Sequence, residues 1–246
     1  MSSKTLRLIR HRIKKFISVR PWLYFPIFRF RSRYGQLLVR EGIDICIEGY
    51  PRSANSFATG AFEKSQPRSV SISHHTHTAA NAIRACQLDV PTIVLIRNPE
   101  DAIISNTALV REVEIVQNRK STNNLIDFSD RIETWITFYS ALKPYKEKFV
   151  IAPFKHVIQD MGAVITEVNA KFGTDFVPFE HTDENTAAVH ASRGYHAGPN
   201  DRRASLKKDT RNDFEAVLKT DEVLKAQLHQ ANKIYESYLS DSDLAE

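Results

Sequence analysis

The sequence is poor in cysteine: its 246 residues include only Cys46 and Cys86. Neither their number nor their spacing suits a disulfide framework or a thiolate metal site. No Asn-x-Ser/Thr acceptor for N-glycosylation occurs either. We therefore expect two reduced core cysteines in a cytoplasmic protein.

Long apolar runs are also missing. The aromatic-rich stretch 21–28 is far shorter than the roughly twenty apolar residues that cross a bilayer. No apolar segment near the start leads to the small-residue cleavage site of a signal peptide. The sequence thus predicts neither a membrane span nor a cleaved leader.

Acidic residues are absent from residues 1–40, which hold eleven of the 34 Lys and Arg and none of the 29 Asp and Glu. We interpret this segment as a basic, aromatic-containing arm preceding one α/β domain at 41–246. The arm could lie on an anionic membrane surface, at the inner face of the membrane, pack on the domain, or bind another polyanion. Nucleic acid is not expected as a partner, because the rest of the chain is acidic and carries no nucleic-acid motif.

Periodicity predicts an α/β fold. We expect a three-layer sandwich with a mainly parallel central sheet, because short apolar segments alternate with helical patterns. The expected strands are 43–48, 69–73, 92–97 and 149–153, and the expected helices are 55–64, 78–88, 99–116, 125–142, 157–172 and 211–239. Residues 181–209 are expected to be a long irregular segment.

A phosphate-binding strand-loop-helix is predicted at residues 50–57. Small polar residues between a strand and a helix direct backbone N–H groups at one point, and Arg52 adds a planar donor fork for phosphate or sulfate oxygens. The loop lacks the Gly-Lys-Ser/Thr of the nucleoside-triphosphate loop, which disfavours a standard ATPase or GTPase.

A second cation follows the next buried strand. Arg97 ends the apolar run that begins at Thr92, and Asn98, Pro99 and two acids then give a helix start. Open α/β sheets bind ligands beyond the carboxyl ends of their strands. Arg97 and Ser105 are therefore predicted to hold a second phosphate.

Together these segments resemble the motifs of sulfotransferases that use 3′-phosphoadenosine 5′-phosphosulfate (PAPS). Pro51-Arg52-Ser53-Ala54-Asn55-Ser56-Phe57 resembles the family's 5′-phosphosulfate loop, and Arg97-Asn98-Pro99-Glu100-Asp101 with Ser105 resembles its 3′-phosphate motif. The resemblance implies a PAPS site formed by Arg52, Ser53, Ala54, Asn55, Ser56, Phe57, Arg97 and Ser105.

One position of the first motif departs from the family pattern, and another has two possible roles. Ala54 replaces the family's glycine, so the loop needs either a negative φ there or mild strain. Phe57 stands where an aromatic residue stacks on adenine in many members. A core position in the first helical turn is the equal alternative for Phe57.

Histidines follow the short strand at 69–73. Sulfuryl transfer to an alcohol needs a base for the acceptor proton, and both His75 and His77 suit that role. The resemblance favours His77 through its His-Thr-Ala context. No carboxylate or cysteine completes a metal site with them, so we expect no metal.

The segment 181–209 is rich in basic residues. Sulfotransferases close a basic loop over the 3′-phosphate, and Arg193, Arg202 and Arg203 resemble parts of that loop. At least one of these arginines is predicted to touch the cofactor.

The sequence therefore predicts transfer of a sulfuryl group from PAPS to a hydroxyl, or less favourably an amine. Arg52 and the arm favour a carbohydrate, glycolipid or lipid headgroup over a small phenol as acceptor. Two alternatives remain: a non-catalytic protein that binds PAP, the desulfated cofactor, or another polyanion, and a kinase with a degenerate phosphate loop.

Overall fold

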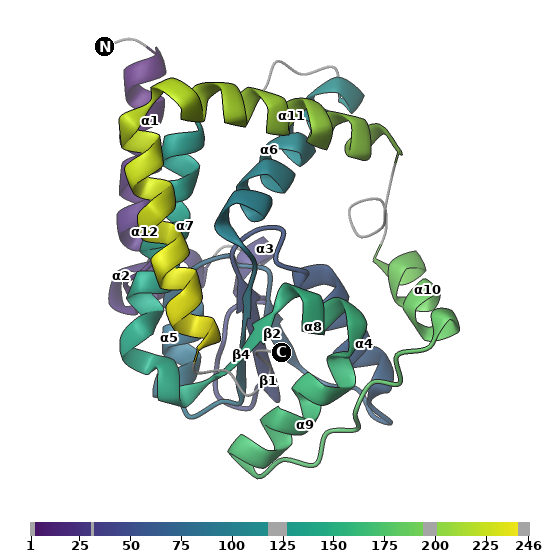
Figure 1. Cartoon of the computed structure of the whole chain (residues 1–246). Helices are drawn as coiled ribbons and strands as arrows, with labels where there is room; N and C mark the ends of the chain where they lie inside the picture. Colours follow the sequence, from purple (N-terminus) through teal and green to yellow (C-terminus); the bar gives the residue numbers. More distant parts are fainter. Residues whose placement is uncertain (1–2, 31, 118–126, 194–200, 241–246) are drawn as a thin grey trace.

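A four-stranded parallel sheet forms the centre of the computed structural model, which describes residues 3–30, 32–117, 127–193 and 201–240 (Figure 1). Its strands are β1 (Ile45–Gly49), β2 (Ile72–His74), β3 (Thr92–Ile96) and β4 (Val150–Pro153), in the spatial order β2-β1-β3-β4. All three neighbouring pairs are parallel. The α/β class and the parallel sheet are confirmed, and three strands lie close to their expected positions. The second strand was expected at 69–73 but is Ile72–His74.

Helices cover both faces of the sheet. Ile47 and Leu95 pack into one apolar cluster, and Val94 and Ile96 pack into another on the opposite face. The first cluster receives α4 (Asn55–Ser65), α8 (Phe154–Gln159), α9 (Met161–Phe172) and α10 (Asp183–Ser192). The second receives α5 (Ala79–Gln87), α6 (Pro99–Val116), α7 (Phe128–Leu142), α11 (Asp201–Thr220) and α12 (Glu222–Leu239). Because both faces are covered, β3 and β4 are mainly apolar rather than alternating, and Glu48 is the charged exception in β1.

The expected amphipathic helix 125–142 is α7, and its aromatics are core residues. Trp135 and Tyr139 are fully buried. The Tyr139 hydroxyl donates to the backbone carbonyl oxygen of Leu95 at 2.8 Å. The Tyr238 hydroxyl of α12 donates to the backbone carbonyl oxygen of Tyr139 at 2.8 Å. These two bonds fix α7 and α12 on β3.

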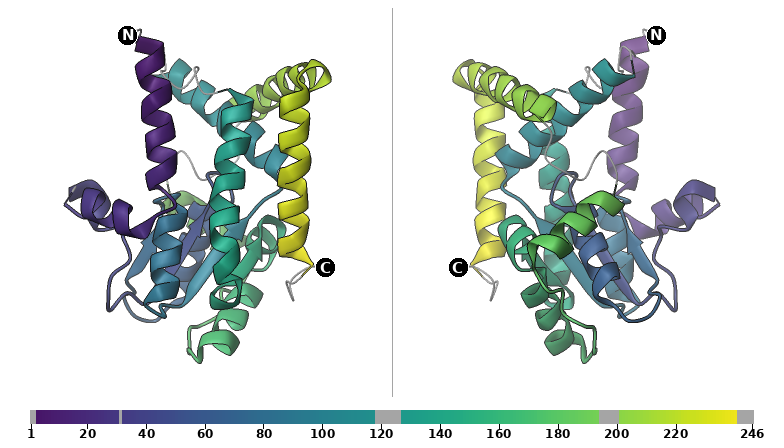
Figure 2. Two further views of the ribbon diagram at one scale, coloured as in Figure 1. Left: turned by 90° about the vertical axis from the view of Figure 1, so that its left-hand side faces the viewer. Right: turned by 90° about the vertical axis from the view of Figure 1, so that its right-hand side faces the viewer.

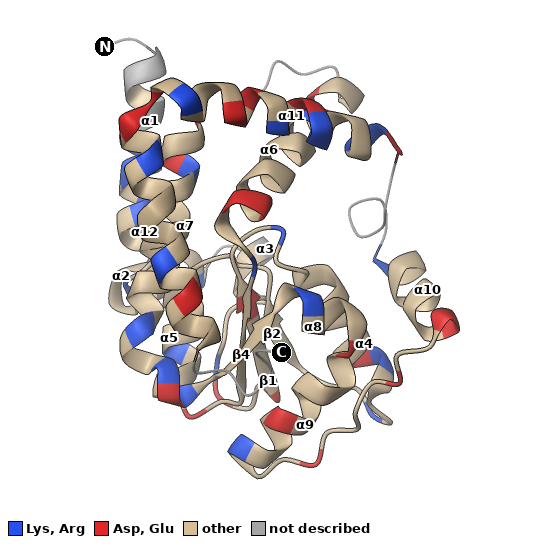
Figure 3. Cartoon of the chain, in the orientation of Figure 1, with Lys and Arg blue, Asp and Glu red and all other residues tan. Residues whose placement is uncertain are grey.

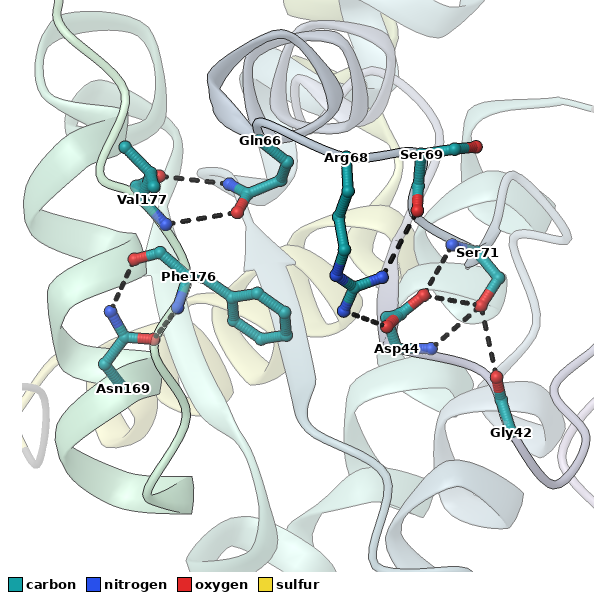
Figure 4. Close-up of polar contacts among 9 residues, drawn as sticks. All are labelled: Gly42, Asp44, Gln66, Arg68, Ser69, Ser71, Asn169, Phe176 and Val177. Carbon is teal, nitrogen blue, oxygen red and sulfur yellow. Dashed lines mark hydrogen bonds and ion pairs between the residues drawn. The ribbon is translucent and has the colours of Figure 1, made fainter.

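A polar network at the amino ends of the strands holds β1 against β2 (Figure 4). Asp44 accepts hydrogen bonds from the backbone N–H and hydroxyl of Ser71, both at 2.7 Å, and pairs with Arg68 at 2.7 Å. The Arg68 partner, together with the Ser71 bonds, holds the pKa of Asp44 at about 2, against the opposing effect of burial. Gln66 exchanges two bonds with the backbone of Val177 beside it.

Three predictions of segment boundaries were wrong. The expected helix 157–172 is split at Asp160, whose side chain caps α9 by accepting from Ala163 N–H. The expected helix 211–239 is split at Asp221, which caps α12 in the same way. The segment 181–209 is not irregular throughout, because it contains α10 and the start of α11; its residues 194–200, with Gly194, Gly198 and Pro199, lie outside the described part.

The basic N-terminal segment forms the helices α1 (Ser3–Ile17), α2 (Pro21–Phe28) and α3 (Ser32–Gly35) (Figure 2). Tyr24 of α2 and Leu38 are buried against Ala80 of α5. Lys15 of α1 pairs with Glu133 of α7 at 2.5 Å. This segment therefore packs on the domain at these contacts. None of the described helices is long and apolar enough to cross a membrane.

Candidate functional site

The strand order places a topological switch point between β1 and β3. The chain leaves β1 through α4 to reach β2 on one side, then crosses through α5 to β3 on the other. Ligands of open α/β sheets bind at such a point, beyond the carboxyl ends of the two strands. The loop with Arg52 follows β1 and Arg97 follows β3, so both predicted anion-binding segments lie at this switch point.

The loop after β1 has an unusual backbone. Arg52 and Ala54 have φ angles of 71° and 69°, in the left-handed region. This conformation is strained for residues with a Cβ. Of the two alternatives expected for Ala54, a negative φ or mild strain, the structure shows the strained one. It turns the chain into α4, which begins without a side-chain cap or an acidic residue in its first turn. The first N–H groups of α4 lack intrahelical partners and are suited to an anion.

The two motifs are joined by direct hydrogen bonds. Arg97 Nη1 donates to the carbonyl oxygen of Arg52 at 2.9 Å, and Arg52 Nε donates to the Ser105 hydroxyl at 3.2 Å. The Arg97 guanidinium lies 4.0 Å from the ring centre of Phe154. Its Nε is buried and has no hydrogen-bond partner within the described residues. The arrangement leaves a buried donor for a ligand.

Positive charge is concentrated at this point. Burial, and then the nearby Arg203 and Arg97, lower the pKa of Arg52 to about 10. Burial also lowers the pKa of Arg97. Lys207 of α11 has a lowered pKa, through burial first and then through Arg97. Cations that depress one another's pKa values are stabilised by a bound anion, so these residues fit the phosphates of a nucleotide such as PAPS.

Two further cations near Arg97, Lys207 and Arg211 of α11, were not predicted as site residues from the sequence. Arg211 pairs with Glu100 at 2.6 Å and Asp101 at 2.7 Å, which ties α11 to the first turn of α6. Lys207 lies one turn earlier on α11 and shares that face. The helical spacing of Arg203, Lys207 and Arg211 was the available signal.

The three arginines predicted from the segment 181–209 lie in different surroundings. Arg203 pairs with Glu112 of α6 at 2.6 Å, and both side chains are buried. Arg193 pairs with Glu63 of α4. Arg202 is exposed on α11. Arg203 is the one that acts electrostatically on Arg52, and the role of all three toward a cofactor stays a prediction.

The other predicted residues of the first loop have distinct contacts. Ser53 is fully buried, and Asn55 Nδ2 donates to the carbonyl oxygen of Tyr50 at 3.1 Å. Ser56 contacts His75, with 3.0 Å between Oγ and Nε2. Phe57 is 5% exposed, with its ring against Phe179, His181 and His190. The structure thus places Phe57 in the core, the alternative to base stacking.

A buried carboxylate positions the histidine loop. Glu48 of β1 is fully buried, and its Oε1 accepts from the N–H and hydroxyl of Thr76 and from Asn81 Nδ2 at 2.7–3.0 Å. Its Oε2 accepts from His77 N–H at 3.0 Å. Burial raises the pKa of Glu48, and His77 opposes this. A glutamate within an otherwise apolar strand was the sequence signal for this residue.

The two candidate bases differ in how their rings are held. His77 Nδ1 lies 2.9 Å from the carbonyl oxygen of Gly49. Because a carbonyl only accepts, Nδ1 carries the proton and Nε2 is left with its lone pair. Both ring nitrogens of His75 are engaged, with Ser56 at 3.0 Å and with His74 Nδ1 at 2.5 Å. Burial, then His74 and His77, lower the pKa of His75 to about 3.

A cavity of about 710 Å³ adjoins these histidines. It lies between α1 and α2 on one side and α7 on the other, and Pro51, His75 and His77 border it. A volume of this size suits a small-molecule ligand. Within the described residues, no three His, Cys, Asp or Glu side chains are grouped to hold a metal ion.

Comparison with models of known protein families and with curated protein sequences finds no match. Among solved structures, the chain is similar to mouse sulfotransferase SULT7A1 complexed with PAP. The similarity covers 84% of this chain and 95% of that chain, at 12% sequence identity and a TM-score of 0.43. What this chain does is therefore inferred from its own residues.

Proposed function

We propose that the protein transfers a sulfuryl group from PAPS to an acceptor hydroxyl. The observation that carries the proposal is the chain of contacts from Arg97 to the Arg52 carbonyl and from Arg52 to Ser105 at the switch point. These contacts bring two partly buried guanidinium groups and the open N-terminus of α4 to one spot. Such preorganised donors stabilise charge that develops when a bond to a leaving phosphate breaks.

Each group has a defined task in this proposal. PAPS supplies the activated sulfuryl group. Arg52 and the N–H groups at the start of α4 bind its 5′-phosphosulfate and offset charge on the departing phosphate oxygen. Arg97 and Ser105, with Lys207 beside them, bind the 3′-phosphate and so select PAPS over ATP.

His77 acts as the general base. Its Nδ1–H bond to Gly49 holds the ring in the tautomer whose Nε2 takes the acceptor proton. Glu48 positions the loop through the His77 N–H. His75 is the weaker base, because a pKa of about 3 leaves little driving force for taking a proton.

The matched variants His77→Ala and His75→Ala test this assignment. With radiolabelled PAPS and 2-naphthol as acceptor, we expect His77→Ala to lower kcat by about 10²- to 10⁴-fold and His75→Ala to lower it much less. Calorimetric PAP binding should stay unchanged in both. The reverse order would transfer the role to His75. PAP binding without turnover in wild type, across a series of hydroxyl acceptors, would support the non-catalytic alternative.

We further propose that the protein is cytoplasmic and that its N-terminal helices contact an anionic membrane surface. Phe16, Trp22 and Phe30 are 53%, 71% and 77% exposed, and the segment around them is basic and free of acids. Amphipathic helices with exposed aromatics and Lys or Arg bind at the interface of anionic bilayers.

A further inference from the structure

The cavity under α1 has a buried cation in its wall, in addition to the cationic side chains of α1. Arg131 of α7 borders it and is only 7% exposed, and its Nε is buried without a hydrogen-bond partner within the described residues. Burial lowers the pKa of Arg131, which expresses the cost of holding its charge away from water. A buried guanidinium that lacks a partner favours a bound anion.

The charged residues near Arg131 indicate which of two neighbouring hollows favours an anion. The described residues that border the large cavity include no Asp or Glu, whereas Arg10, Lys14 and Lys15 of α1 add positive charge. Arg131 also borders a smaller hollow of about 290 Å³, but Asp127 and Asp221 lie there, and Arg111 in its wall is paired with Asp213 at 2.8 Å. An anion is therefore favoured in the large cavity, which is the one that reaches His77.

Aromatic side chains line part of the cavity wall, beside polar ones such as Ser18, Asn106 and Thr134. Tyr24 and Phe28 of α2 stack with 4.5 Å between ring centres, and both border the cavity together with Tyr34 and Phe138. Aromatic walls of this kind take flat or bulky apolar groups and leave the polar ends of a ligand to a few placed side chains. The two polar ends here are the histidine loop and Arg131.

We propose that the acceptor is a small amphipathic compound that carries, besides the hydroxyl, a carboxylate, sulfate or phosphate bound by Arg131. The placement of the acceptor hydroxyl at His77 rests on the proposed function. The anion at Arg131 and the apolar body against the aromatic wall follow from the cavity itself. A cavity of about 710 Å³ with an aromatic wall favours a small molecule over the carbohydrate or lipid headgroup expected from the sequence.

A pair of probes with the same ring and the same hydroxyl isolates the anion. Titration of wild type without PAP, followed by fluorescence, should show 6-hydroxy-2-naphthoate binding at least tenfold more tightly than 2-naphthol. Equal binding of the two probes, or binding of neither, would overturn the proposal.

Variants of Arg131 then locate the effect. Arg131→Met should remove the preference for the naphthoate, Arg131→Lys should restore part of it, and Arg84→Met on the exposed face of α5 should leave it unchanged. Loss of binding for both probes in Arg131→Met alone would indicate a structural role and overturn the proposal. PAP titration of the same proteins separates the two inferences: naphthoate binding through Arg131 without PAP binding would sink the sulfotransferase assignment and leave the anion site standing.

Discussion

Ala54 and Arg52 hold left-handed backbone angles beside the start of α4. The left-handed conformation costs a residue with a Cβ roughly 1–2 kcal/mol. The same two turns bring the Arg52 side chain to Ser105 and its carbonyl oxygen to Arg97. The strain is therefore located where the two anion-binding segments meet, which is where strained backbone is typically retained for function.

Replacing Ala54 by glycine should relieve this strain. We expect Ala54→Gly to raise the free energy of unfolding by up to about 1 kcal/mol, because glycine adopts positive φ freely while adding some entropy to the unfolded chain. The exposed Ala187, inside α10, is the matched control, and Ala187→Gly should cost about 1 kcal/mol. Urea denaturation measures both. A loss of stability in Ala54→Gly as large as in the control would contradict the strained conformation.

At the scale of elements, segments with a clear apolar period were predictable from sequence and α11 was not. The strand from Thr92 and the helix from Pro99 combine a buried run with capping residues, so their type and limits follow from local physics. The start of α11 lacks such a pattern: of its 20 residues, Arg203, Thr210 and Phe214 are buried. Both signs of charge alternate along it (Figure 3). It is held by ion pairs with α6 that no local pattern reveals.

Breaking the buried ion pair between α6 and α11 should destabilise the fold strongly. Arg203→Met leaves Glu112 buried without this partner, which costs about 3–5 kcal/mol. Arg111 pairs with Asp213 between the same helices but is partly exposed, so Arg111→Met should cost less than about 1 kcal/mol. Chemical denaturation of the two variants makes the comparison. Equal, small losses would show that the Arg203 pair does not anchor α11.

At the scale of the whole molecule, the meeting of Arg52, Arg97 and Ser105 was predictable and the cavity was not. Both motifs follow strands of a parallel sheet, which the alternation of strands and helices predicts, so they lie at the same edge. That β1 and β3 are neighbours is known from the structure. The cavity needs α1 beside α7 and α2 packed on α5, which depends on the Lys15–Glu133 pair and on Tyr24 and Leu38 against Ala80. The apolar spacing of Leu6, Ile9, Ile13 and Phe16 indicates a helix but not the element on which that helix packs.

The exposed N-terminal aromatics should govern membrane contact. Sedimentation with vesicles of phosphatidylcholine plus phosphatidylserine should show binding that is weakened several-fold by Trp22→Ser with Phe30→Ser, because both rings are exposed. Vesicles of phosphatidylcholine alone should bind weakly, and added salt should reduce binding to the anionic ones. Val223→Ser, at a 63% exposed position on α12, is the control. Equal binding by the double variant and the control would contradict a docking role for this segment.

The central claim is that Arg52, Arg97 and Ser105 form a site for PAPS. Calorimetric titration of wild type, Arg97→Ala and the surface control Arg84→Ala, with PAP and separately with ATP plus magnesium, tests it most directly. We expect micromolar PAP binding in wild type and control, at least tenfold weaker binding in Arg97→Ala, and weak ATP binding throughout. Tight magnesium-dependent ATP binding, or binding of neither nucleotide, would contradict the claim.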